Sequence, residues 1–364
     1  MASLILPPGS TLGMLGGGQL GRMTALAAAR LGYRTHVYTP EPDSPCAEVS
    51  AAATVADFTD AEALAGFAAA VDVVTLEWEN VPPEAAGLLA QRVPVRPGAA
   101  VLVVTRDRIR EKSFVNCLGI ATAPWRPVHS VADLTAALQD LGRPAVLKVA
   151  RLGYDGKGQV LLGPDTDPEA AWHDLALGQA LDAVLEGFVD FACEISVIVA
   201  RGADGALCSY PAVENQHANH ILARTLVPAR IAPAVAAEAE AIARRITEAL
   251  GVVGLLAVEM FVGHDGRVLV NELAPRPHNS GHWTLDACAT SQFEQLVRAV
   301  CGLPLGATGR LTDAVMENLI GADIERWPEL LAAPAARLHL YGKREVRPGR
   351  KMGHVTWIGR AVTP

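Results

Sequence analysis

The stretch Arg151-Leu-Gly-Tyr-Asp-Gly-Lys-Gly158 decides the fold expected for this chain. It lies between two apolar runs, 144–149 and 159–162, and each run is typical of a short β-strand. Glycines let backbone N–H groups approach a ligand closely, while Lys148 and Lys157 add positive charge. The pattern predicts a β-hairpin whose tip folds over a polyphosphate. A Walker loop is excluded because it opens a helix, whereas a strand follows here; a plain structural turn is the alternative for the loop taken alone.

Length and composition narrow the class of protein. A chain of 364 residues exceeds a single core, so more than one domain is expected. The net charge of −8 argues against a nucleic-acid partner and requires any phosphate binding to be local. No apolar run is long enough to span a bilayer, and the N-terminus lacks a basic n-region, so a cytoplasmic protein without membrane attachment is predicted. The six cysteines show no CxxC spacing, which favours reduced thiols over a zinc site.

The first hundred residues alternate between strand-like and helix-like segments. This order predicts an open, Rossmann-like parallel α/β domain over residues 1–100. Its expected strands are 11–15, 34–38 and 71–76, and its expected helices are 19–31, 61–70 and 82–91.

The rest of the chain predicts α+β architecture. A small lid domain over 101–185 begins with a helix at 107–118 and contains the glycine-rich hairpin. A larger domain over 186–308 has strands at 195–200, 254–262 and 267–271, with a helix at 232–250, as in an antiparallel sheet covered on one face. A C-terminal lobe over 309–364 is expected, either separate from or continuous with the larger domain.

A second glycine-rich segment, Gly16-Gly-Gly-Gln-Leu-Gly21, fits G-x-G-x-x-G between a predicted strand and a predicted helix. Glu41 follows about twenty residues later, at the usual spacing of a ribose-binding acid. A dinucleotide site is therefore a competing interpretation. A tight turn between strand and helix is the simpler one.

An acidic pair predicts a metal site. Glu259 lies on one predicted strand, Asp265-Gly266 forms the turn, and Asn271 with Glu272 lies on the returning strand. Antiparallel pairing places such residues side by side, and oxygen ligands of this kind suit Mg²⁺ that carries nucleotide phosphates.

Two basic segments predict anion binding. The loop Ala274–Trp283 carries Arg276, His278, Asn279, Ser280 and His282 between rigidifying prolines, a density of donors that suits a phosphorylated intermediate. Either histidine can instead play a supporting role. The segment Lys343–Lys351 contains a Pro-Gly turn among its cations and predicts a local phosphate site, with a solvated surface as the alternative. The linker after Glu186 offers backbone groups for an adenine edge, and Glu194 suits ribose hydroxyls.

In five motifs the chain resembles the N5-carboxyaminoimidazole ribonucleotide synthetase family, ATP-grasp enzymes of purine biosynthesis. The resemblance covers nearly the whole chain, and its motifs are Gly17-Gly-Gln-Leu-Gly-Arg-Met23, Gly153-Tyr-Asp-Gly-Lys-Gly-Gln159, Glu214-Asn-Gln-His217, Asn271-Glu-Leu-Ala-Pro-Arg-Pro-His-Asn-Ser-Gly-His-Trp-Thr284 and Glu345-Val-Arg-Pro-Gly-Arg-Lys-Met-Gly-His354.

The resemblance implies an ATP-grasp fold and a Mg-ATP-dependent ligase that carboxylates aminoimidazole ribonucleotide with bicarbonate, through carboxyphosphate. It also implies a homodimer. The residues that it assigns to ATP are Arg108, Lys148, Glu186, Val189, Glu194, His217 and Asn271, and those assigned to Mg²⁺ are Glu259 and Glu272. The residues that it assigns to the reacting groups are Tyr154, Asp155, Lys157, Arg276 and His278. The residues that it assigns to the ribonucleotide are Gln19, Leu20, Glu79, Asn279, Ser280, Lys343, Arg350 and Lys351.

The chain departs from the family in the lid, where Leu152 replaces one of two glycines. Three competitors share part of the pattern. A biotin carboxylase or a formate-dependent transformylase would use another acyl source or acceptor, a nicotinamide oxidoreductase would bind NAD at Gly16–Gly21, and a non-enzymatic nucleotide sensor would lack turnover.

Overall fold

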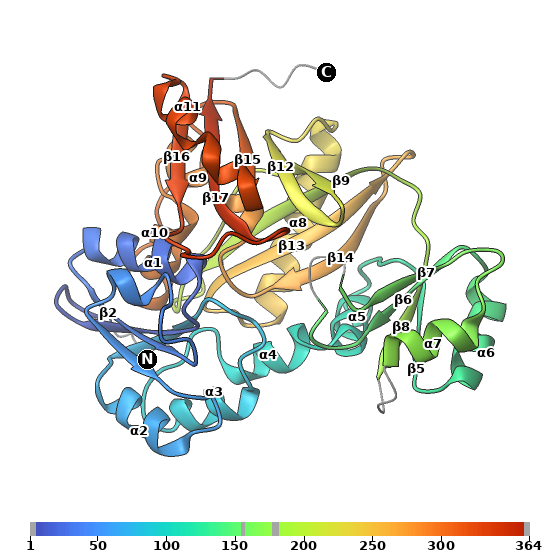
Figure 1. Ribbon diagram of the computed structural model, residues 1–364, viewed down its shortest axis with the longest axis horizontal. Helices are drawn as coiled ribbons and strands as arrows, with labels where there is room; N and C mark the ends of the chain where they lie inside the picture. The colour runs from blue at the N-terminus through green and yellow to red at the C-terminus, as the bar shows by residue number, and fades with distance from the viewer. Residues whose placement is uncertain (1–4, 154–156, 177–181, 360–364) are drawn as a thin grey trace.

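The computed structural model describes residues 5–153, 157–176 and 182–359 (Figure 1). Its N-terminal part is a parallel sheet with the strand order β3-β2-β1-β4. The strands are β1 (Thr11–Leu15), β2 (Arg34–Thr39), β3 (Ala52–Val55) and β4 (Val73–Leu76), and the main helices are α1 (Gln19–Arg30), α2 (Ala61–Ala69), α3 (Pro83–Ala90) and α4 (Ala99–Thr105). The parallel α/β domain predicted from the sequence is confirmed.

Local sequence explains where these elements begin. All four residues of the short β4 strand are buried, as expected of a parallel sheet that is covered on both faces. The side chain of Asp60 accepts the N–H groups of Glu62 and Ala63 and caps α2. Pro83 occupies the first turn of α3, where its missing N–H is not needed. The starts of α2 and α3 therefore follow from single residues.

The lid domain is a smaller sheet with the strand order β5-β8-β6-β7, set apart on the right of Figure 1. Its strands are β5 (Trp125–Val128), β6 (Ala145–Val149), β7 (Gln159–Leu162) and β8 (Ala183–Gly187), and its helices are α5 (Arg108–Cys117), α6 (Val131–Leu141) and α7 (Pro168–Ala176). Strands β6 and β7 pair antiparallel, with Lys148 opposite Gln159 at the end next to the connecting loop. The predicted hairpin is thus confirmed, and we refer to it as the lid hairpin.

The large sheet has the strand order β14-β13-β9-β11-β12-β15-β17-β16, with β10 paired to β9. Its strands are β9 (Phe191–Arg201), β10 (Leu207–Ser209), β11 (Val213–Ala218), β12 (Ile221–Val227), β13 (Gly254–Gly263), β14 (Val268–Ala274), β15 (Ala314–Ile320), β16 (Ala336–Leu340) and β17 (Lys351–Ile358). All these pairs are antiparallel, which confirms the α+β architecture of this region.

The expectation that helices cover one face of this sheet was wrong. Helix α8 (Pro233–Ala249) packs on the β9 face that includes Val197 and Val199, and α10 (Gln292–Val300) packs on the face that includes Ile198 and Ala200. The physical reason is the sequence of β9, where residues 195–200 are buried throughout rather than at alternate positions. Helix α10 also contacts α1, so one core joins the large sheet to the N-terminal domain.

The C-terminal strands β15, β16 and β17 extend the large sheet rather than forming a sheet of their own (Figure 1). Strand β17 lies between β15 and β16, although it follows both in the chain. The short helix α11 (Trp327–Ala332) packs on β16. The domain boundaries at residues 100, 185 and 308 stay predictions.

Within residues 5–153, 157–176 and 182–359, no helix is long and apolar enough to cross a membrane. The six cysteines are free thiols; Cys46, Cys288 and Cys301 are buried and Cys117 is exposed.

Candidate active site

A cleft of about 620 Å³ opens where the N-terminal domain, the lid domain and the large sheet meet. It brings together most of the residues singled out in the sequence: Gln19, Leu20, Glu79, Arg108, Lys148, Lys157, Glu186, Val189, Glu194, His217, Glu259, Asn271, Glu272, Arg276, His278, Asn279 and Lys351 line it. These residues come from segments far apart in the chain, so the cleft is a product of the whole fold.

The acidic pair lies on neighbouring strands. Glu259 on β13 is directly opposite Glu272 on β14, as the hairpin predicted. A carboxylate oxygen of Glu272 lies 3.0 Å from the Arg108 guanidinium, and Glu259 Oε1 lies 2.8 Å from His278 Nε2. Burial alone would raise the pKa of Glu259, but its close contact with the His278 ring outweighs burial and lowers that pKa. Glu259 is therefore held as a carboxylate.

These residues fit a divalent cation that prefers oxygen ligands. Asn271, next to Glu272, has a buried side-chain oxygen without a hydrogen-bond partner among the described residues. Two carboxylates and an unsatisfied amide oxygen form a donor set that suits Mg²⁺. No group of three His, Cys, Asp or Glu side chains within the described ranges forms a metal cluster, so the amide oxygen is essential to this interpretation.

The loop after β14 carries the next two site residues. The Arg276 guanidinium pairs with the Glu79 carboxylate from the loop after β4, and thereby links the large sheet to the N-terminal domain. This pairing lowers the pKa of Glu79, although burial acts in the opposite direction. Gln292, at the start of α10, holds the backbone of His278: its Oε1 accepts the His278 N–H at 2.9 Å and its Nε2 donates to the His278 carbonyl at 2.7 Å.

Lys148 on β6 and Glu186 on β8 pair where the lid sheet lines the cleft, and a residue that the sequence did not reveal also contacts Glu186. Glu186 is buried between Lys148 at 3.0 Å and Lys112 at 3.1 Å. Burial would raise the pKa of Glu186, but the two lysines lower it to about 2. Lys112 is almost fully buried on α5. It lies within the helix predicted at 107–118, but no motif in the sequence distinguished it from its neighbours. The Glu186 side chain is thus engaged with lysines, which leaves the backbone after it for a base.

A second residue of α5, the acid Glu111, was also missed. Glu111 is buried, and its Oε2 accepts the N–H of Leu273 at 2.8 Å, one residue beyond Glu272. Burial, and then the charge of Glu272, raise the pKa of Glu111 far above the usual range of a carboxyl. Glu111 therefore fixes the backbone of β14 next to Glu272 through this hydrogen bond.

At the other end of the cleft, Glu194 on β9 pairs with His217 on β11 at 2.8 Å. Burial would lower the pKa of His217, but its hydrogen bond to Glu194 raises it. Val189 and the exposed Phe188 flank this pair on the strand-connecting linker. An acid, an imidazole and an apolar linker suit a nucleoside.

The glycine-rich segment at Gly16–Gly21 does not offer its N–H groups to a dinucleotide. The Glu77 carboxylate accepts the N–H groups of Gly18 at 2.8 Å and Gly21 at 3.2 Å. A Cβ on Gly17 would lie 2.4 Å from the Ser44 side chain, so the glycine is needed for packing within the protein. The dinucleotide interpretation was therefore wrong, because a protein carboxylate occupies the place that a pyrophosphate would take.

The C-terminal basic segment reaches the same region. Lys343 Nζ donates to the Lys351 carbonyl at 2.8 Å, and Lys351 lines the cleft. Burial, followed by the charges of Arg350 and Lys351, lowers the pKa of Lys343 to about 8, with Glu77 acting in the opposite direction. Such a cluster of cations is stabilised by an arriving anion.

Four predicted residues need separate mention. Tyr154 and Asp155 lie outside the described residues. Ser280 is fully buried behind His278, with its Oγ 2.7 Å from His278 Nδ1. A direct contact between Ser280 and a substrate conflicts with this burial. Asn279 lines the cleft, and its buried amide atoms have no hydrogen-bond partner within the described ranges.

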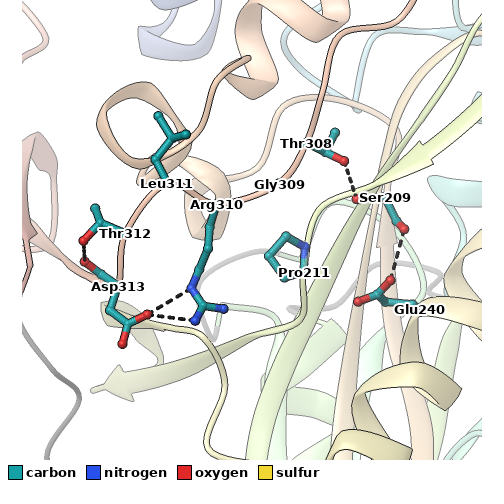
Figure 2. Close-up of a pocket in the computed structure, with 9 residues that line it drawn as sticks. All are labelled: Ser209, Pro211, Glu240, Thr308, Gly309, Arg310, Leu311, Thr312 and Asp313. Carbon is teal, nitrogen blue, oxygen red and sulfur yellow. Dashed lines mark hydrogen bonds and ion pairs between the residues drawn. The ribbon is translucent and has the colours of Figure 1, made fainter.

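A second hollow, of about 540 Å³, is lined by Ser209, Pro211, Glu240 and residues 308–313 (Figure 2). Its polar groups bond to one another: the Ser209 hydroxyl donates to Glu240 at 3.2 Å, and Arg310 pairs with Asp313 at 2.9 Å. Thr308 donates to the Ser209 carbonyl at 2.8 Å. We assign no ligand to this hollow.

Comparison with known families agrees with the geometry. Family models match residues 10–106 (ribonucleotide synthetase preATP-grasp domain), 113–293 (ATP-grasp domain) and 314–363 (phosphoribosylaminoimidazole carboxylase C-terminal domain). The fold and the cleft thus define an ATP-grasp ligase.

Relatives of known name narrow this class. The N5-carboxyaminoimidazole ribonucleotide synthase of Brucella melitensis is 52% identical over 97% of each chain. That of Bacillus subtilis is 44% identical over 98% of this chain and 94% of its own. A crystal structure of an N5-carboxyaminoimidazole ribonucleotide synthetase in complex with ADP superposes with a TM-score of 0.94 at 44% identity, covering 98% of this chain and 94% of that one. The chain belongs to the N5-carboxyaminoimidazole ribonucleotide synthase family.

Proposed function

We propose that the protein carboxylates 5-aminoimidazole ribonucleotide with bicarbonate and ATP in purine biosynthesis, yielding N5-carboxyaminoimidazole ribonucleotide, ADP and phosphate. One observation carries the proposal: the Glu259–Glu272 pair and the Arg276–His278 loop share a cleft with Lys351. A phosphate-handling centre and a basic anion site on one cleft suit a reaction that joins an activated acid to a phosphorylated acceptor.

ATP is assigned to the part of the cleft between the lid domain and the large sheet. Lys148 and Arg108 supply positive charge for the phosphates, Lys157 approaches from the lid hairpin, and Glu194 with His217 takes the ribose. The backbone near Val189 reads the adenine edge. Glu186 acts by holding Lys148 in place, since both of its oxygens face lysines.

Glu259, Glu272 and Asn271 are assigned to Mg²⁺. When bound, the ion neutralises the charge that develops on the transferred phosphoryl group. For it to be held, Arg108 and His278 must share or release the carboxylates that they contact in this structure. The two basic groups are then free to face the phosphates and the bicarbonate-derived oxygens.

The chemistry proceeds in two steps. A bicarbonate oxygen attacks the γ-phosphorus, ADP leaves, and carboxyphosphate forms next to Arg276 and His278. The exocyclic amine of the ribonucleotide then attacks the carboxyl carbon of carboxyphosphate, or of the CO₂ released from it, phosphate leaves, and Asp155 accepts the amine proton. Tyr154 and Lys157 are assigned to the same lid segment, which excludes water from the labile intermediate.

The ribonucleotide phosphate is assigned to the cations in the loop that joins β16 to β17 and at the start of β17. We refer to these two strands and their loop as the C-terminal hairpin. Lys343, Arg350 and Lys351 repel one another, and the low pKa of Lys343 reflects burial together with that repulsion. A phosphate dianion relieves it. Gln19 and Leu20 at the start of α1, together with Glu79 and Asn279, line the cleft and are assigned to the ribonucleotide.

The proposal is tested by ADP release with Mg-ATP and bicarbonate, measured with and without aminoimidazole ribonucleotide. Strong dependence on the ribonucleotide is expected. ADP release that needs formate instead of bicarbonate would support a transformylase, and ADP release indifferent to the ribonucleotide would overturn the acceptor. Two further proposals rest on the family likeness alone: a homodimer, checked by light scattering, and a cytoplasmic location.

A further inference from the structure

A row of polar side chains crosses the large sheet and ends at the cleft. Glu259 on β13 is opposite Ser196 on β9, and Asn215 on β11 is opposite Thr225 on β12. Ser196 is opposite Val213, two residues before Asn215, so all four side chains stand on the same face of the sheet. Polar residues are unexpected there, because Ser196, Asn215 and Thr225 are buried.

Hydrogen bonds join this row to His278. Thr225 Oγ1 lies 3.1 Å from Asn215 Oδ1, and Asn215 Nδ2 lies 3.0 Å from Ser196 Oγ. Ser196 Oγ is 2.7 Å from Ser280 Oγ, which in turn is 2.7 Å from His278 Nδ1. The row therefore continues through the loop after β14 to an imidazole that lines the cleft.

The donors and acceptors in this row have a direction. Each hydroxyl has a single proton. Because Asn215 Nδ2 donates to Ser196, the Ser196 proton is free for Ser280, and the Ser280 proton is free for His278 Nδ1. The Ser280 backbone N–H also points to Nδ1, at 3.4 Å. His278 Nδ1 is therefore an acceptor, and the ring proton is on Nε2, which faces Glu259 at 2.8 Å.

We propose that Ser196 and Asn215 are positioning residues that fix His278, through Ser280, as its Nε2–H tautomer. The proposal rests on the function assigned to the cleft above. An Nε2–H group in the cleft donates to an oxygen of the phosphorylated intermediate, whereas an Nε2 lone pair would repel it. This also gives Asn215, in the segment Glu214–His217, a role that the substrate sites did not supply.

Two variants break the row in different ways. Asn215→Asp keeps the shape of the side chain but replaces its donor with an acceptor. The Ser196 hydroxyl then donates to the new carboxylate instead of to Ser280, so the direction of the hydrogen bond between Ser196 and Ser280 reverses. The share of His278 rings that carry their proton on Nδ1 should then rise. Ser196→Ala interrupts the row without burying a charge, and both tautomers should be present. Thr225→Val is the matched control: it removes a buried hydroxyl from the far end but leaves Asn215 Nδ2 donating to Ser196.

Nitrogen-15 NMR of histidine-labelled protein reads the tautomer without substrate. The chain has 10 histidines, and His278→Gln identifies the signal. The wild type and Thr225→Val should show Nε2–H. A wild-type ring protonated on Nδ1, or on both nitrogens, at pH 8 overturns the proposal, and so does an unchanged tautomer in a folded Ser196→Ala.

Steady-state kinetics supply the second readout. Ser196→Ala should lower kcat about tenfold, as loss of a group that orients a functional residue commonly does. The KM values for ATP and the ribonucleotide should change less than about twofold, since uniform binding is untouched. A loss no greater than that of Thr225→Val would mean that the row only supports packing. Absent ribonucleotide-dependent turnover in the wild type would sink the proposed function and leave the NMR result standing.

Discussion

The N-terminal domain forms one wall of the cleft and the large sheet forms the other, which we call the ATP-grasp wall. Both walls contain carboxylates, but the carboxylates have different kinds of partner. On the N-terminal wall, the Gly16–Gly21 loop lies against a carboxylate, Glu77, that accepts its N–H groups. On the ATP-grasp wall, the Glu259 and Glu272 carboxylates are paired with the side chains of His278 and Arg108. Backbone partners fix a group, whereas side-chain partners can be exchanged for a ligand. A glycine-rich or acidic motif therefore indicates a structural role or a ligand site, depending on whether its polar groups bond to the backbone or to side chains.

The largest effect is expected from Glu272→Gln on the ATP-grasp wall. Loss of a carboxylate assigned to Mg²⁺ should lower kcat by about 10²–10³-fold, since charge stabilisation at the reacting phosphate is lost. Thermal unfolding should stay close to that of the wild type. Glu240→Gln, beside the hollow of Figure 2, is the control and should keep full activity. Near-normal turnover of Glu272→Gln would refute the metal assignment.

The N-terminal wall is tested by Glu77→Gln. An amide can accept only one of the two glycine N–H groups and turns an NH₂ toward the other, so stability should fall by about 1–3 kcal/mol. Urea unfolding measures this loss. The exposed Glu84→Gln, in the first turn of α3, should change stability little. If Glu77→Gln unfolds like the wild type, the N–H groups of Gly18 and Gly21 do not depend on this carboxylate.

Arg350→Ala tests the C-terminal hairpin that adds cations to the cleft. Removal of one cation assigned to the ribonucleotide phosphate should raise the KM for the ribonucleotide about tenfold and leave the KM for ATP unchanged. Arg347→Ala is a matched control in the same turn, because Arg347 is exposed and pairs with Glu345. A change confined to the KM for ATP would mean that Arg350 contacts ATP and not the ribonucleotide.

Acid should weaken the junction between the loop Ala274–Trp283, which contains His282, and strand β17, which contains His354. His282 and His354 are buried with their rings 4.7 Å apart, and burial lowers the pKa of each well below its usual range. Below about pH 6.5 the unfolded chain therefore binds protons that the folded protein cannot, so stability falls as pH falls. From pH 7.5 to 6, each ring should account for a loss of about 1 kcal/mol. Thermal unfolding of His354→Phe should show a shallower pH dependence; an unchanged slope would contradict this.

The smallest effect concerns the lid hairpin. Leu152 has a φ of 64°, a backbone conformation that suits glycine, and its side chain is exposed. Leu152→Gly should relieve strain of about 1 kcal/mol, offset by the greater freedom of glycine in the unfolded chain. A change of stability within about 1 kcal/mol is expected, whereas Leu152→Ala should not stabilise the protein. Marked destabilisation by glycine would show that the leucine side chain supports the lid.

Sequence reasoning recovered the features set by neighbouring residues. The lid hairpin follows from two apolar runs around a glycine loop, and the Glu259–Glu272 pairing follows from a single turn at Asp265-Gly266. It missed features that depend on distant contacts. The Glu77 carboxylate accepts the N–H group of Gly18, 59 residues earlier in the chain. Lys112 on α5 forms an ion pair with Glu186 on β8. No local pattern encodes such contacts, because they exist only once the sheets have packed.

The place of β17 has a consequence for how the enzyme is made. This strand follows β15 and β16 in the chain yet lies between them. During synthesis, β15 and β16 therefore emerge with unpaired edges that only the later segment can fill. Because Lys351 begins that segment, a nascent chain has no complete cleft until its sheet can also close. Truncated chains should consequently be both inactive and prone to aggregate, and so be removed rather than consume ATP.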